Sequence, residues 1–416
     1  MRRWALLLTG LLALASVAVA SPSGATEAEP HWAITHLGTL GGKESGDYLS
    51  GGPAAINEYS AIVGQSLTIK GRRHAFLWQT GKMRDLGTLG GPESEAVAIN
   101  AHGQIVGSAD TRLKGKFGSP VAHAFLWENG RIHDLGTFAG PSSAAVAINE
   151  RGEVVGSADT KARDEEGYPI MHAFLWKSGK MRDLGTLGGP SSAATDINAN
   201  GQVVGWSSIK RRYGNGQQRA HAFLWERGKL RDLGVLPGGK ESTAVAINDQ
   251  GQIAAYSYYT SFEGSTPGHN VDHGTAFLWQ KGRKATIGAE DTFPRTLNAH
   301  GQVIGEIYDG GKQWMDDAGT GLIPQAFTWW SGRQRILAQG EGAWTQGVNG
   351  AGQIVGLVFP PSGEGLRACI WERDGRLVLL PALRGAHDSK AVAINEHTEI
   401  VGMSGDQAVL WTLKRG

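Results

Sequence analysis

One phrase recurs along this chain at nearly constant spacing. Its clearest copies begin at His74, His123 and His172, and they share the words His-Ala-Phe-Leu-Trp, Asp-Leu-Gly-Thr and Ile-Asn-x-x-Gly. A residue found in every copy serves first to build the repeating unit. We therefore expect the shared words to specify the architecture, and we look for function where the copies differ.

Two residues mark each copy, and the two series interleave strictly. From Asn57 to Asn395 there are 338 residues over seven intervals, or about 48 per unit. Periods of roughly 40–50 residues are typical of propeller blades or paired-helix arrays. The markers number eight of each kind: Asn57, Asn100, Asn149, Asn198, Asn248, Asn298, Asn349 and Asn395, and Trp78, Trp127, Trp176, Trp225, Trp279, Trp329, Trp371 and Trp411.

The pattern inside a unit decides between these two architectures. One copy offers four short runs rich in Val, Ile, Phe and Trp, at 96–100, 104–108, 124–127 and 131–135. Gly, Pro, Asn and Ser separate such runs, as is typical of strands, and the repeats lack the long 3.6-residue apolar period of an amphipathic helix. The sequence therefore predicts an all-β fold, an eight-bladed β-propeller of four-stranded blades.

The two ends of the chain complement each other. The last copy, from Ala391, stops after its third strand at Trp411, whereas residues 32–42 supply a fourth strand and its connector without the preceding three. An open array would leave both fragments with unpaired edges. We therefore predict that the N-terminal strand pairs beside the 408–411 strand and closes the ring.

The repeated words resemble the bacterial extracellular HAF repeat, a family named from its first three letters. The resemblance covers residues 32–412 and implies an exported repeat protein with no assigned reaction, so it transfers no catalytic residue. The later units depart from the pattern. Thr275, Gln325 and Arg367 replace the His, and the connector is lost between 286 and 297 and between 336 and 348.

The N-terminus has the features of a secretory signal peptide. A basic start is followed by the apolar run 4–19 and by Ala18-Val19-Ala20 before Ser21. We predict a signal peptide at 1–20, a linker at 21–31 and a single propeller domain at 32–416, secreted or periplasmic in a bacterium. No second apolar run approaches the roughly 20 residues of a membrane span, so we expect no transmembrane segment.

The net charge bears on the possible partners, and the cysteine content bears on cross-links. Without Arg2 and Arg3 the chain has 38 Lys and Arg against 39 Asp and Glu, a net charge of −1. This balance argues against nucleic acid as a partner. Cys369 is the only cysteine, so no intramolecular disulfide forms, and we expect a buried thiol in a monomeric protein.

The recurring polar residues are structural candidates rather than catalytic ones, because equivalent positions on successive blades lie far apart. The Asp316-Asp317 stretch lacks the alternating acidic ligands of a calcium loop, and no nucleophile or zinc motif is present. We therefore expect no catalytic residue, no metal and no cofactor. The residues in question are His74, His123, His172 and His221, and Asp85, Asp134, Asp183 and Asp232.

The links between the second and third strands vary most, and those of the fourth to sixth units are the longest and the most aromatic. Exposed aromatic rings beside hydrogen-bonding groups suit sugar rings or peptides. The alternative is that these rings pack their own loops. The candidate ligand-binding residues are Trp206, Arg212, Tyr213, Tyr256, Tyr259, Asp272, His273, Trp314 and Asp316.

These features predict an exported, non-catalytic binding module whose partner is a glycan, a cell-surface polymer or a protein ligand, held on the face of the long loops. One alternative is a polysaccharide lyase or glycoside hydrolase at the channel mouth. It would need Asp272, His273, Tyr259, Arg212 and Asp316 to converge on one substrate. The other alternative is a scaffold in a surface assembly, marked by a large exposed apolar patch.

Overall fold

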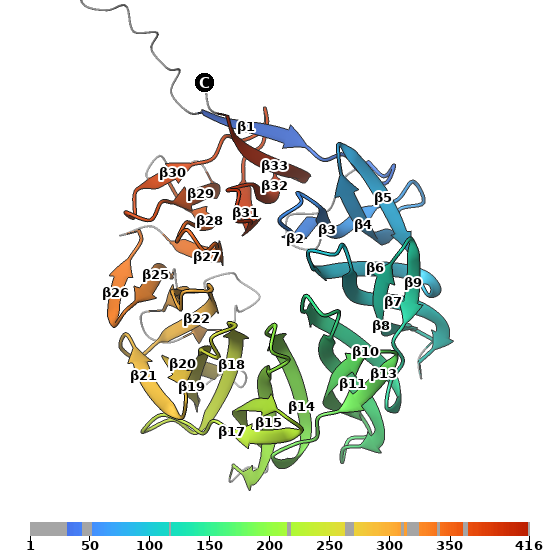
Figure 1. Cartoon of the computed structure of the whole chain (residues 1–416), viewed down its shortest axis with the longest axis vertical. Helices are drawn as coiled ribbons and strands as arrows, with labels where there is room; N and C mark the ends of the chain where they lie inside the picture. The colour runs from blue at the N-terminus through green and yellow to red at the C-terminus, as the bar shows by residue number, and fades with distance from the viewer. Residues whose placement is uncertain are drawn as a thin grey trace, which may run out of the picture.

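The computed structural model is a closed ring of eight antiparallel sheets (Figure 1). It describes residues 31–43, 52–115, 118–213, 218–262, 270–308, 312–313, 324–338, 342–360 and 365–414. Within these ranges the only helices or strands are β-strands, and no helix there could cross a membrane. The predicted eight-bladed propeller is confirmed.

The first four blades follow one another along the chain, each from its inner to its outer strand. Blade 1 is β2 (Gly52–Ile56), β3 (Ile62–Leu67), β4 (Arg73–Gln79) and β5 (Lys82–Gly87). Blade 2 is β6 (Gly90–Ile99), β7 (Ile105–Lys114), β8 (Pro120–Glu128) and β9 (Arg131–Asp134). Blade 3 is β10 (Ala139–Ile148), β11 (Val154–Arg163), β12 (Pro169–Lys177) and β13 (Lys180–Asp183). Blade 4 is β14 (Gly188–Ile197), β15 (Val203–Arg212), β16 (Gln218–Glu226) and β17 (Lys229–Asp232).

The last four blades vary more. Blade 5 is β18 (Glu241–Ile247), β19 (Ile253–Phe262), β20 (Asn270–Gln280) and β21 (Arg283–Ile287), and the short β24 (Lys312–Gln313) pairs with β20 as a fifth strand. Blade 6 is β22 (Thr292–Leu297), β23 (Val303–Ile307), β25 (Gln325–Trp330) and β26 (Arg333–Ile336). Blade 7 is β27 (Ala343–Val348), β28 (Ile354–Val358), β29 (Arg367–Trp371) and β30 (Leu377–Leu379). Blade 8 is β31 (Ser389–Ile394), β32 (Ile400–Ser404), β33 (Gln407–Lys414) and β1 (His31–His36).

Blade 8 joins the two ends of the chain. Strand β1 pairs antiparallel with β33, and Ile34 lies opposite Trp411. The predicted closure by the N-terminal strand is therefore confirmed, and β1 forms the outer edge of the blade (Figure 1). The predicted signal peptide at 1–20 and nearly all of the linker lie outside the described residues.

The repeated Asn builds both the turn and the joint between blades. Asn100 Oδ1 accepts the amides of His102 at 3.1 Å and Gln104 at 3.0 Å, which fixes the turn from β6 to β7. Its Nδ2 donates across the blade boundary to the carbonyl oxygen of Asn149, at 3.1 Å. All eight Asn side chains make this bond to the next blade, at 2.9–3.2 Å.

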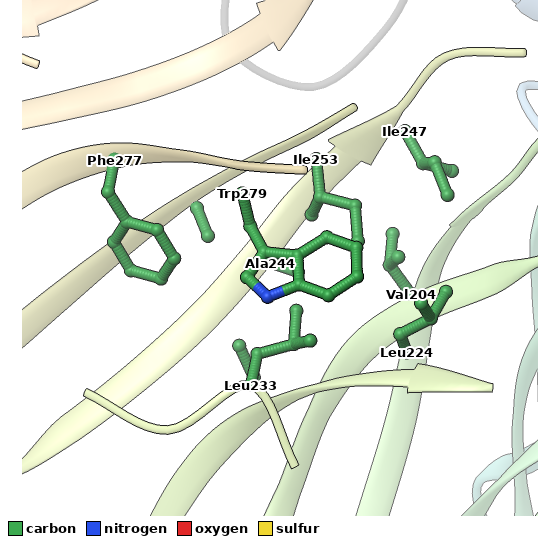
Figure 2. Close-up of a cluster of buried hydrophobic side chains, with 10 residues drawn as sticks. Val204, Leu224, Leu233, Ala244, Ile247, Ile253, Phe277 and Trp279 are labelled. Atoms are coloured by element: carbon green, nitrogen blue, oxygen red, sulfur yellow. The ribbon is translucent and has the colours of Figure 1, made fainter. Parts of the chain in front are cut away.

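Apolar layers between neighbouring blades form the core. The third strand is apolar on consecutive residues because its sheet lies between two others. Figure 2 shows one layer, in which Val204 and Leu224 of blade 4 lie against Ile253 and Trp279 of blade 5. Cys369 lies fully buried in the layer between blades 6 and 7, as expected, and burial raises the pKa of its thiol well above the usual value.

The strand order gives the ring two different faces. The turn face carries the short turns from first to second and from third to fourth strand. The loop face carries the links from second to third strand and the connectors between blades. The repeated His and Asp meet near the loop face: His123 Nδ1 lies 2.9 Å from Asp134 Oδ2, and its Nε2 lies 3.1 Å from the carbonyl of Pro141 in the next blade. The same His–Asp pair forms in each of the first four blades.

Candidate functional site

Most of the predicted aromatic residues of the loop face pack on, or hydrogen-bond to, neighbouring residues. Tyr213 donates its hydroxyl to Glu241 Oε1 at 2.7 Å, and the Arg219 guanidinium lies 4.5 Å from its ring centroid. Tyr256 packs edge-on against Phe293 of the next blade, with 5.4 Å between the ring centroids. These rings help to hold blades 4 to 6 together, which corresponds to the self-packing alternative.

The structure brings two of the predicted residues together. Tyr259 stacks on His273 with 5.1 Å between ring centroids, and its hydroxyl lies 3.0 Å from Glu290 Oε1. His273 Nδ1 lies 3.1 Å from Asp291 Oδ1, and both side chains are about 14% exposed (14% and 13%). Trp314, Asp316 and the side chain of Asp272 lie outside the part of the chain that the structure describes.

The other two predicted residues, Trp206 and Arg212, line a cavity between blades 3 and 4 on the loop face. Among the described residues, no group of three or more His, Cys, Asp and Glu side chains could hold a metal ion. The expected site on blades 4 to 6 is therefore divided between separate places rather than gathered at one.

A different site lies on the turn face, in a niche that the repeat forms between neighbouring blades. Between blades 2 and 3 this niche is lined by His102, Gln104, Glu128, Glu150 and Arg151, among others. Its charges are mixed, with two carboxylates. Gln104 Nε2 donates to Glu128 Oε2 at 2.7 Å, so much of its polar surface is satisfied internally.

Between blades 6 and 7 the same niche has changed character. Trp330 stands at the repeat position of Glu128, and Gly350 stands at that of Glu150. Both acidic side chains are thus lost, and the cavity has a volume of about 430 Å³, compared with about 320 Å³ between blades 2 and 3. Its lining residues are Asn298, His300, Gln302, Thr328, Trp330, Arg333, Arg335, Gly350, Ala351, Gly352 and Arg373.

The charge of this blade 6–7 pocket is strongly positive. Three arginines and His300 line it, and none of its lining residues is acidic. Glu396 lies nearby, but its carboxylate already accepts the amide of Gly350, at 2.7 and 2.9 Å. No ion pair forms between Arg333, Arg335 or Arg373 and any described carboxylate, so their charge is available to a ligand.

Local packing fixes the position of two of the arginines. The Arg373 guanidinium lies 5.6 Å from the ring centroid of Trp330, whose side chain remains 47% exposed. Arg335 lies directly against Gly375 of the next blade, where any Cβ atom would collide with its guanidinium. Gly375 also has a φ of +84°, which favours glycine. A stacked cation and an exposed indole face therefore share one wall.

A main-chain donor adds to this arrangement. In the other seven blades, the amide two residues after the turn Asn donates to that Asn side chain. Ala351 of blade 7 makes no such bond, although Gln353 still donates to Asn349 Oδ1 at 3.0 Å. Ala351 is exposed, and its amide is therefore a further donor at the pocket wall. Guanidinium groups and backbone amides together form the usual recognition set for a carboxylate or phosphate.

Sequence reasoning placed no site here, although a signal was present. The residue after the closing Trp of each repeat is Gln, Glu or Lys in blades 1 to 5 and in blade 7, and only blade 6 has an aromatic residue there. Trp330 is thus a departure from the repeat at the end of β25, beside a short turn and away from the long loops where the site was expected.

Comparison with known proteins defines the class of fold. No protein family profile matches the chain, and no curated protein matches it. Among solved structures, it resembles the Porphyromonas gingivalis dipeptidyl peptidase 4, at 10% identity and a TM-score of 0.54, over 87% of this chain and 56% of that one. A Pyrococcus horikoshii acylaminoacyl peptidase is 12% identical (80% and 53% covered, TM-score 0.44), and a Mycobacterium tuberculosis puromycin-hydrolyzing peptidase is 11% identical (90% and 60% covered, TM-score 0.45). The chain therefore spans little more than half the length of these proteins, and the likeness defines a β-propeller.

These neighbours correct the predicted function. The first of them, at a TM-score of 0.54, is a dipeptidyl peptidase, and this finding overturns the prediction of a non-catalytic module for glycans or cell-surface polymers, together with its alternatives of a polysaccharide-active enzyme and a surface scaffold. The physical reason lies in the aromatic residues: Tyr213, Tyr256 and Tyr259 pack on their neighbours instead of presenting a joint sugar-binding face. The HAF resemblance, the export signal and the monomeric state stay predictions.

Proposed function

We propose that this protein is a propeller that handles peptides, and that the blade 6–7 pocket binds a peptide segment in which an acidic side chain lies beside an aromatic or apolar one. The observation that carries the proposal is the joint lining of the pocket by Trp330 and three arginines, with no acidic residue among the lining residues. A peptide ligand also agrees with the dipeptidyl peptidase, which acts on peptides, but that likeness concerns the fold alone.

The pocket chemistry supports each part of this ligand. Arg333, Arg335 and Arg373 offer forked N–H donors that fit a carboxylate. The exposed face of Trp330 offers apolar area to a neighbouring side chain of the peptide. The amide of Ala351, between two glycines in the pocket wall, offers a main-chain donor to the peptide backbone. A cavity of about 430 Å³ is in the range of sites for small ligands or for a few peptide side chains.

The test uses the purified protein and three labelled decapeptides of alternating residues: Asp-Phe, Asn-Phe and Lys-Phe. Fluorescence anisotropy should show binding of the Asp-Phe peptide, at least about tenfold weaker binding of the Asn-Phe peptide, and none of the Lys-Phe peptide. The affinity should fall as salt rises, because charged groups make the contact. Equal affinity for the three peptides would overturn the proposal.

Variants place the binding at the pocket. Trp330→Gln restores the residue that Gln79 and Gln280 supply in blades 1 and 5, so the variant should fold normally. It and Arg373→Gln should each weaken Asp-Phe binding by about tenfold or more. The matched control is Arg151→Gln in the mixed-charge niche of blades 2 and 3, which should leave binding unchanged. The same affinity in all three variants would place the ligand elsewhere.

A further inference from the structure

The cavity between blades 3 and 4 is separate from the blade 6–7 pocket and opens on the other face of the ring. It has a volume of about 820 Å³. Its apolar wall consists of Trp206 with Pro169, Ile170 and Pro190. Trp206 lies on β15, where Ala193 and Ala222 are its small cross-strand partners, so no large neighbour covers the indole from within its own sheet.

This cavity also arises where one copy of the repeat departs from the others. Trp206 stands at the position of Ser157 in blade 3, and Ser208 stands at that of Asp159. In blade 3, Asp159 Oδ2 accepts the amide of Ser142 at 3.1 Å, so its side chain reaches the connector. Ser208 is too short to make the corresponding bond in blade 4. The exchange of Asp for Ser therefore leaves the space open, and the exchange of Ser for Trp gives it an aromatic wall.

The free hydrogen-bonding groups of the cavity include one pure donor, the indole N–H of Trp206, and one hydroxyl that can donate or accept, that of Ser208. Trp206 Nε1 and the Ser208 hydroxyl make no hydrogen bond to a described residue, although Ser208 is only 4% exposed. The nearby acceptors are already occupied. The carbonyl of Pro190 lies 3.1 Å from His172 Nε2, and the amide oxygen of Gln218, in its favoured orientation, accepts from Arg212 at 2.7 and 2.8 Å.

The charged groups at the rim are largely satisfied within the protein. Arg163 donates to the carbonyl of Gly167 at 2.9 Å, and Arg212 lies 3.5 Å from Glu165. Asp164 accepts the amides of Glu166 and Tyr168 and so fixes the turn between β11 and β12. Glu166 contributes one more carboxylate at the exposed edge. The interior therefore favours an uncharged ligand that has apolar faces and hydrogen-bond acceptors.

From this combination we infer that the cavity binds an extended, proline-rich peptide segment. Each X-Pro amide supplies a carbonyl acceptor and no N–H donor, which complements Trp206 Nε1 and the Ser208 hydroxyl. Pyrrolidine rings pack on the indole face and against the two wall prolines, as in other aromatic-lined grooves that take such segments. A polyproline II segment is ordered before it binds, so it loses little conformational entropy.

The test compares two labelled, end-blocked octapeptides, octaproline and the alternating sequence Ser-Ala, by fluorescence anisotropy with the purified protein. We expect octaproline to bind at least about tenfold more tightly. Trp206→Ser restores the serine of blades 2 and 3 and should abolish that preference. Ser208→Ala should weaken octaproline binding several-fold. Equal binding of the two peptides, or an unchanged preference in Trp206→Ser, would overturn the inference.

A second readout and a crossed control separate this inference from the proposed function. The indole N–H signal that is missing from the NMR spectrum of Trp206→Ser identifies Trp206, and it should shift when octaproline is added to the parent protein. Trp330→Gln should leave octaproline binding intact, and Trp206→Ser should leave Asp-Phe binding intact. If only octaproline binding or only Asp-Phe binding is absent, the result therefore shows which of the two proposed sites is wrong.

Discussion

The side-chain amide of Asn395 donates to the main-chain carbonyl oxygen of Asn57, which is 3.1 Å away in space and 338 residues earlier in the chain. Asn100 and Asn149, 49 residues apart, make the same bond at the same distance of 3.1 Å. The joint that closes the ring therefore uses the same contact as the joints along the chain. The ring is continuous at this layer, although its last blade is assembled from both ends.

This equivalence predicts that Asn395→Ala and Asn149→Ala lower the free energy of unfolding by similar amounts. Each Asn side chain holds its own turn through Oδ1 and the next blade through Nδ2, so each alanine variant loses several buried hydrogen bonds. We expect each to lower the free energy of unfolding by about 2–4 kcal/mol in urea titrations. A loss below about 0.5 kcal/mol in Asn395→Ala alone would show that the closing joint contributes little.

The repeated His should also contribute to stability. His123 connects Asp134 of its own blade to the Pro141 carbonyl of the next. We expect His123→Ala to lower the free energy of unfolding by about 1–3 kcal/mol, since it removes both contacts and leaves the partly buried carbonyl without its partner. The exposed His102→Ala on the turn face is the control and should change stability by less than about 0.5 kcal/mol.

A carboxyl between blades 4 and 5 predicts how stability depends on pH. Asp196 stands where five other blades have Ala, and its two oxygens accept the amides of Ile197 and of Ile247 in blade 5, both at 2.8 Å. Burial raises the pKa of Asp196 to about 6, despite these two hydrogen bonds. The folded protein therefore binds this proton more tightly than the unfolded chain does. The resulting stabilisation is complete below pH 3.8 and is lost as pH rises to about 6.

The non-titrating variant Asp196→Asn tests this dependence. We expect the variant to gain about 1–3 kcal/mol relative to the parent protein between pH 4 and pH 7, as the parent carboxyl ionises. Urea unfolding of both proteins at several pH values measures the difference. Parallel curves would mean that Asp196 titrates alike in the folded and unfolded states.

The fold could be predicted because it depends on local chemistry that is repeated. The turn at Asn100 needs a side-chain acceptor and, at Gly103, a φ of +74°, and both requirements are visible in the sequence as Ile-Asn-x-x-Gly. The incomplete last unit and the isolated first strand likewise specified the closure. These signals lie within a few residues of one another or at the two ends of one period.

The sites depend instead on contacts across a blade boundary. Arg373 follows Trp330 by 43 residues, and only the ring geometry places its guanidinium over that indole. In the same way, Tyr256 packs against Phe293 from the next blade, although the sequence suggested that its ring was available to a ligand. Trp206 and Arg212 lie in one cavity because both belong to strand β15, and residues of one strand can be placed together from the sequence alone.

The closing strand provides the last prediction. Ile34 packs partly buried in the apolar layer that contains Val409 and Trp411, whereas its neighbour Thr35 is exposed. Ile34→Asp places a carboxylate in this layer, and we expect it to lower the free energy of unfolding by about 2–4 kcal/mol. Detachment of β1 would expose the edge of β33 to other chains, so size-exclusion chromatography should show oligomers that grow with concentration. Thr35→Asp, on the outward side of the same strand, should stay within about 0.5 kcal/mol of the parent protein. If the two variants behave alike, then the packing of β1 against β33 is not what keeps the ring closed.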